Sequence, residues 1–155
     1  KISYEILRRF KPNTIKIASR TLIDSPELVE EIIKNHKNVI ISLGMWDKEL
    51  NELPYESKNI SYMWCKSKYP CTPWDIIGLP KQFLESKYIG YSDHTIGIEA
   101  CLIAVSRGAK IIEKHFTLDK SDTTIRDHAL SATPDEFLQL SRIGRDIFEK
   151  IKIGV

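Results

Sequence analysis

The chain has 155 residues, of which 42% are hydrophobic and 28% are charged, and this ordinary globular composition excludes an intrinsically disordered protein. Its formal net charge of +2 at pH 7 gives no reason to expect nucleic acid or an anionic membrane as a partner. No apolar run approaches the ~20 residues of a membrane span. The three cysteines are too few and too irregularly spaced for a disulfide framework, so we expect a reducing, cytoplasmic compartment.

The first half of the chain alternates short apolar runs with helical patterns. A short helix is predicted over 4–10, and the alternating residues 14–18 predict a strand. Ser25 and Pro26 form a helix start, with serine as the N-cap and proline at the first helical position. The remaining elements predicted here are strands over 38–43 and 59–65 and a short helix within 47–59.

The second half continues the same alternation after a proline-rich loop over 66–80, for which a helical turn is predicted near 75–77. A strand over 88–92 precedes a helix that Thr95 can cap and that Gly108 ends. The remaining elements predicted here are a strand over 110–115, a polar loop over 118–131 and a helix to Lys152 that begins at the capping box of Thr133 and Glu136.

Five strands that alternate with helices predict an α/β protein with a parallel sheet. The short, Val/Ile-rich strands fit a sheet that is covered on both faces. Such units could form an open doubly wound sheet, or they could be part of a (β/α)8 barrel, which needs ~250 residues when complete. The element pattern leaves both architectures open.

Polar residues gather at the carboxyl ends of the predicted strands, where parallel α/β proteins bind their ligands. Because side chains alternate along a strand, Ser92 and His94 share one face, and so do Glu113 and His115. If the two strands are neighbours, two imidazoles and a carboxylate lie together, a set that suits Mn, Fe or Zn with positions left for substrate. The alternative is that each histidine caps a strand or hydrogen-bonds within the core.

Lys16 lies between two isoleucines and must face opposite to both, toward the interior, where a buried ammonium needs an anionic partner. Hydroxyls at Ser19, Ser42 and Ser92 would complete a site for phosphate or carboxylate. The alternatives are a lysine whose ammonium reaches solvent and serines that simply end strands.

The sequence also supports interpretations of four further residue types. Glu113 could orient His115 or act as an acid or base. Asp127 lies in a loop, where aspartate usually serves turn geometry. Cys101 lies on an apolar helix face and is predicted to be a core residue, while the tryptophans do not form a stacking series for nucleic acid.

Two strings, GYSDHTIGIEA from Gly90 and GAKIIEKHFTLD from Gly108, resemble the sialic acid synthase family, which includes N-acetylneuraminate, legionaminate and pseudaminate synthases. The segments at 16–19, 42–45, 65–70 and 127–137 are similar to the same family in the same order. The resemblance implies a partial (β/α)8 TIM barrel, about strands four to eight with their helices, over residues 1–155.

The resemblance also implies the roles of individual residues. It assigns His94 and His115 as ligands of a divalent metal, most typically Mn²⁺. It assigns the phosphoenolpyruvate site to Lys16, Ser19, Ser42, Ser67 and Ser92, although Ser67 stands where the family often has asparagine. It assigns Tyr69 and Asp127 to the sugar, and Glu113, His94, His115 and Asp127 to catalysis.

The implied reaction condenses phosphoenolpyruvate with N-acetylmannosamine or a related N-acylated amino sugar and releases phosphate. Ile125 and Arg126 depart from the family's usual Gly-Pro, so the resemblance does not choose the sugar. The resemblance also implies a homodimer of the full-length protein through a C-terminal antifreeze-like domain, which we expect to be absent from this chain.

The length fits one average domain, but the chain begins at Lys1 without methionine or signal peptide. We therefore expect a piece of a longer synthase that lacks the first three barrel strands and is inactive alone. The alternatives are a metal- and anion-binding module without turnover, and a structural α/β domain in which the motifs have no function.

Overall fold

The computed structural model describes residues 2–46 and 52–154. Its strands are hydrogen-bonded in chain order, which is the order expected of successive β/α units. The strands are β1 (Thr14–Ile17), β2 (Asn38–Ser42), β3 (Ile60–Cys65), β4 (Tyr88–Asp93) and β5 (Ile111–Lys114). The α-helices are α1 (Ile2–Arg9), α2 (Ser19–Asp24), α3 (Pro26–Asn35), α4 (Glu99–Ser106) and α5 (Pro134–Lys152). Short 3₁₀ helices occur at η1 (Pro73–Ile76), η2 (Phe83–Glu85) and η3 (Arg126–His128).

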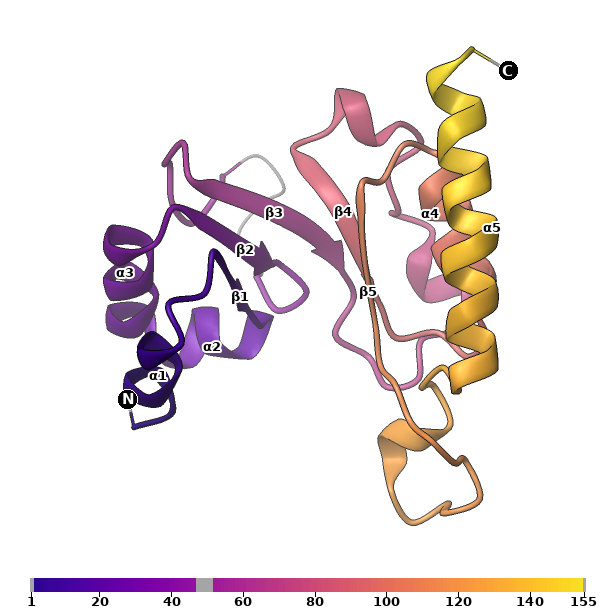
Figure 1. Ribbon diagram of the computed structural model, residues 1–155, viewed down its shortest axis with the longest axis horizontal. Helices are drawn as coiled ribbons and strands as arrows, with labels where there is room; N and C mark the ends of the chain where they lie inside the picture. Colours follow the sequence, from indigo (N-terminus) through magenta and orange to yellow (C-terminus); the bar gives the residue numbers. More distant parts are fainter. Residues whose placement is uncertain (1, 47–51, 155) are drawn as a thin grey trace. The chain divides into compact units, whose positions relative to one another are not determined.

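The chain forms two compact units, which are described separately. The first unit, Lys1–Tyr62, contains the parallel pair of β1 and β2 together with α1, α2 and α3 (Figure 1). Alternate residues of β1 are buried, so Ile15 and Ile17 lie inside and Lys16 does not. The buried hydrophobic residues of this unit are Tyr4, Ile15, Ile17, Leu22, Val29, Ile32, Val39, Ile41, Leu43 and Tyr62.

The second unit, Met63–Val155, contains the parallel pair of β4 and β5 with α4 and α5 beside it (Figure 1). In this pair Ser92 is the register partner of Glu113, and Asp93 is the partner of Lys114. The main apolar cluster consists of Trp64, Leu79, Phe83, Tyr91, Ala100, Ala104 and Ala109. A second cluster of Ile98, Cys101 and Leu140 lies between α4 and α5, which confirms Cys101 as a core residue.

Most predicted elements are present within two residues of their predicted ends, but two predictions were wrong. Ser19 does not end a strand: β1 stops at Ile17, and Ser19 begins the six-residue helix α2, which is too short to show a clear helical period. Thr95 does not cap α4, which begins at Glu99. The backbone N–H and hydroxyl of Thr95 both donate to the Asp93 carboxylate, so this side chain serves the strand end instead.

The capping box at the start of α5 is confirmed, since Thr133 and Glu136 each accept a backbone N–H of the other. The short helix predicted within 47–59 falls partly outside the described residues, and 52–59 contain no helix. All three cysteines are free. Within the described parts of the chain, no helix has the length and apolarity needed to cross a membrane.

Candidate active site at the ends of β4 and β5

His94 and His115 directly follow β4 and β5, and their ring centroids lie 5.2 Å apart. The Nδ1 of His94 lies 2.9 Å from the Lys66 carbonyl oxygen, which can only accept, so Nδ1 carries the proton and Nε2 keeps its lone pair. Burial lowers the pKa of His94 below its ordinary value of 6.5, although the hydrogen bond to Lys66 opposes this shift. The imidazole is therefore neutral at pH 7, the form that binds a metal.

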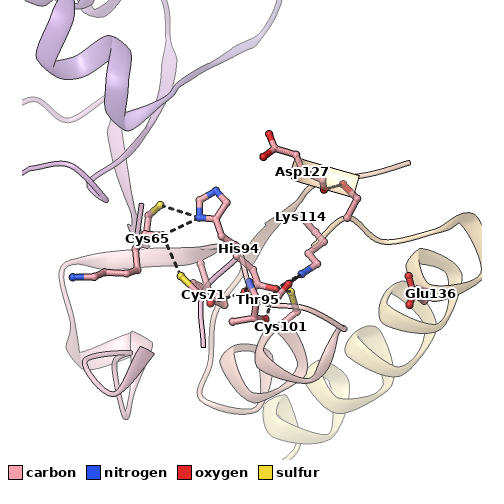
Figure 2. A network of polar contacts seen from close by, with 12 residues as sticks. Cys65, Cys71, His94, Thr95, Cys101, Lys114, Asp127 and Glu136 are labelled. Atoms are coloured by element: carbon pink, nitrogen blue, oxygen red, sulfur yellow. Dashed lines mark hydrogen bonds and ion pairs between the residues drawn. The ribbon is translucent and has the colours of Figure 1, made fainter. Parts of the chain in front are cut away.

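The Tyr69 ring packs against both imidazoles, with centroid distances of 4.2 Å to His94 and 5.9 Å to His115. Burial raises the pKa of Tyr69, while a hydrogen bond from Ser67 lowers it, so its hydroxyl stays protonated at neutral pH. Figure 2 shows Cys65 facing His94, with its Sγ 3.8 Å from Nδ1. The tyrosine predicted to contact the sugar thus lies beside both predicted metal ligands.

Ser92 and Glu113 form the polar pair that strand alternation predicts. The Ser92 hydroxyl donates to the Glu113 carboxylate across the two strands at 2.7 Å. Ser92 is buried and Glu113 is partly buried, so the contact is partly shielded from water. The hydrogen bond holds the carboxylate on the same side of the β4–β5 pair as the two histidines.

Asp127 lies in η3, and its Oδ2 is 3.8 Å from Nδ1 of His115. Arg126 donates to the other carboxylate oxygen at 2.9 Å, and this hydrogen bond holds the pKa of Asp127 below its usual range. The Arg126 guanidinium also stacks over the Tyr69 ring at 4.8 Å. The sequence interpretation of Asp127 as a turn residue and its assignment to the sugar are both compatible with this position.

A buried ion pair on the other side of the same strands was missed by the sequence analysis. Lys114 donates to Asp93 at 2.6 Å, and their side chains are 1% and 0% exposed. Figure 2 shows Lys114 extending toward Thr95 and Cys101, which also bind this carboxylate. The sequence contained a signal for this pair. Asp93 and Lys114 each alternate with a histidine of the site, so both must face the covering helices, where a buried charge needs a partner.

The first unit holds the other predicted phosphoenolpyruvate residues. Lys16 faces opposite to the isoleucines, as predicted, but it is exposed, so the expectation of a buried ammonium was wrong. Ser42 ends β2 and is 1% exposed, and its Oγ has no hydrogen-bond partner within residues 2–46 and 52–154. Ser19 is also buried. A buried hydroxyl without a partner is a group that a ligand oxygen could satisfy.

The donor set fits part of a coordination shell. Two imidazoles and a nearby carboxylate suit a divalent transition metal, and a site with few protein ligands leaves positions for substrate. Among the described residues, no group of three or more His, Cys, Asp or Glu side chains has the geometry of a metal site. The assignment of His94 and His115 as metal ligands stays a prediction.

The fold and this cluster define a parallel α/β protein with a polar site at the carboxyl ends of its strands. The sequence profile of the NeuB family matches residues 1–154. The chain belongs to the NeuB family.

The similar proteins agree with this assignment. An uncharacterized protein of Methanocaldococcus jannaschii is 42% identical, over 88% of this chain and 42% of its own length. The N,N'-diacetyllegionaminic acid synthase of Campylobacter jejuni is 34% identical, over 99% of this chain and 48% of its own length. This chain therefore spans less than half the length of both relatives.

The structure of N-acetylneuraminic acid synthetase from Leptospira borgpetersenii, in complex with citrate, superposes with a TM-score of 0.79. It is 30% identical, and the match covers 98% of this chain and 55% of that chain. The predicted fold class is confirmed, since the five parallel strands correspond to part of a synthase barrel. The resemblance read from the two histidine strings is confirmed as well.

Proposed function

We propose that this chain is the metal-binding part of a nonulosonic acid synthase. As part of a longer chain, it condenses phosphoenolpyruvate with N-acetylmannosamine or a related N-acylated amino sugar and releases phosphate. The observation that carries the proposal is the pair of imidazoles 5.2 Å apart beside the Ser92–Glu113 hydrogen bond, in a chain whose family includes such synthases.

The two histidines would hold the divalent cation, most simply Mn²⁺. Nε2 of His94 is the available ring nitrogen, because Nδ1 is bound to the Lys66 carbonyl. When bound, the cation supplies Lewis-acid polarisation of the sugar's aldehyde oxygen. Burial keeps His94 neutral near pH 7, so no proton has to leave this imidazole before it binds metal at that pH.

The remaining residues would bind and orient the two substrates. Ser92 and the unpartnered hydroxyl of Ser42 are suited to oxygens of phosphoenolpyruvate, and the positive charge of Lys16 is suited to its negative charge. Tyr69 and Asp127 would face the sugar. C3 of phosphoenolpyruvate then attacks the aldehyde carbon, water adds at C2, and the C–O bond to phosphate breaks. Holding both reactants in this alignment accounts for much of the rate enhancement.

Glu113 is the acid or base best placed within the cluster, since its carboxylate already accepts the Ser92 hydroxyl. Asp127 is held ionised by Arg126 and is suited to accept hydrogen bonds from sugar hydroxyls rather than to donate a proton. A second candidate function is a metal- and anion-binding module without turnover, which would need the two adjacent imidazoles and the unpartnered Ser42 hydroxyl but no acid or base.

A manganese titration of the 155-residue chain tests the metal part of the proposal. His115→Ala removes one imidazole and is expected to weaken Mn²⁺ binding at least tenfold, measured by calorimetry. His36→Gln serves as the matched control, because His36 lies outside the cluster and contacts Tyr4. Equal affinity of the wild-type chain and His115→Ala would remove the metal site from the proposal.

A further inference from the structure

The buried pair of Asp93 and Lys114 lies immediately beside both proposed metal ligands in the chain. Asp93 precedes His94, and Lys114 precedes His115. Their side chains are 0% and 1% exposed and meet at 2.6 Å, on the side of β4 and β5 opposite to Ser92 and Glu113. The pair therefore contacts neither the sugar nor the phosphoenolpyruvate positions proposed above.

The ion pair holds the backbone on both sides of His94. The Asp93 carboxylate accepts the backbone N–H of Thr95 at 2.9 Å and the hydroxyl of Tyr91 at 2.6 Å. The Lys114 ammonium, in addition to Asp93, donates to the backbone carbonyl of Thr95. The residues before and after His94 are thus tied to each other and to β5.

The same pair links the two strands at their carboxyl ends. Asp93 and Lys114 are register partners, so their ion pair is a direct cross-strand link one residue before the imidazoles. A slip by one residue would turn His94 or His115 to the helix side and bury a charge without a partner. The separation of the two rings depends on this register.

We propose that Asp93 and Lys114 are positioning residues that set the spacing of His94 and His115 for binding one divalent cation. The inference rests on the metal-binding function proposed above. A pair with only a structural role would stabilise the fold without affecting the imidazoles. The two roles differ in what happens when the charges are replaced by apolar groups of similar volume.

The decisive variant is the double substitution Asp93→Leu/Lys114→Met. Removing both charges leaves no buried ion unpaired, and such replacements of buried pairs commonly preserve the fold. The ties to the Thr95 backbone are lost nonetheless. Lys110→Met is the matched control, because Lys110 is an exposed lysine just before the other end of β5. Circular dichroism establishes that each variant is folded.

Two measurements on the 155-residue chain test the inference. In the double variant we expect the Mn²⁺ dissociation constant to rise about 10–100-fold, as when a group supporting a metal ligand is removed. In metal-free protein labelled on histidine, we expect the nuclear Overhauser contact between the two imidazoles to weaken. Lys110→Met should leave both quantities unchanged.

A folded double variant with the wild-type dissociation constant and the wild-type ring contact would overturn the inference. If the wild-type chain binds no Mn²⁺, the proposed function fails, and the contact between the two imidazoles alone tests the positioning role of the pair. Loss of that contact in the double variant would then support the positioning role, and its retention would overturn the role. If the double variant does not fold, Asp93→Asn/Lys114→Gln replaces it. Its neutral, weaker hydrogen bonds are expected to shift both measurements in the same direction.

Discussion

Replacing Gly90 with alanine is expected to destabilise the second unit by forcing β4 away from β5. A Cβ at this position would lie 2.0 Å from the carbonyl oxygen of Ile111 and 2.9 Å from its Cβ, whereas ordinary contacts are 3.4–4 Å. Ile111 is the register partner of Gly90, so the obstacle is the backbone of the neighbouring strand rather than a flexible side chain. The strands must separate by more than an ångström, or Gly90 must twist.

We expect a loss of about 3 kcal/mol in the free energy of unfolding, the upper end of the range for overpacked sites, because the clash is with the backbone. For a chain of this size that loss corresponds to a fall in Tm of roughly 6–12 °C. Urea unfolding followed by circular dichroism measures the first quantity, and calorimetry measures the second.

Gly144→Ala is the matched control for this substitution. Gly144 lies in α5, and the nearest atom to an added Cβ is Cγ2 of Val105 at 3.8 Å, an ordinary contact. Alanine in a helix interior is expected to stabilise by about 0.5–1 kcal/mol relative to glycine. A Gly90→Ala variant within about 0.5 kcal/mol of the wild-type chain would refute the steric reasoning.

The remaining predictions concern turnover and acid stability. We expect the isolated chain to release no phosphate when it is supplied with phosphoenolpyruvate, N-acetylmannosamine and Mn²⁺, because it spans less than half the length of the related synthase. Phosphate release by the wild-type chain that is abolished in His94→Ala would contradict this prediction. Lys120 and the backbone of Thr133 lower the pKa of Glu136 below 4.5. Because the folded-state pKa is the lower one, the resulting stability is present above pH ~4.5 and is lost as the pH falls through the folded-state value. Urea unfolding of Glu136→Gln should therefore show a weaker dependence on pH between about 5 and 3 than the wild-type chain, and equal slopes would exclude the effect.

Strand alternation predicted much of the candidate site without any structure. It placed Ser92 on the same face as His94, and Glu113 on the same face as His115. The structure agrees, because Ser92 donates a hydrogen bond to Glu113 and the rings of His94 and His115 lie next to each other. The period of two is a local property of any strand, so it can be read from a short segment. The roles of these residues in metal binding and catalysis stay predictions.

Interactions between distant segments could not be read in the same way. The stacking of Arg126 on Tyr69 depends on how a long polar loop returns to the sheet, and no periodicity constrains that path. Thr95 shows the same limit at short range. Its residue type favours an N-cap, but the buried carboxylate of Asp93 competes for its donors and displaces the start of α4 to Glu99.

The sequence by itself determined the class of the fold, the family and the strand ends at which polar groups gather, because these follow from local periodicity and from contiguous motifs. Only the tertiary structure decided how the strand ends are held. The link between Asp93 and Lys114 joins residues 21 positions apart, and its buried charges require a partner that only the folded sheet brings within reach.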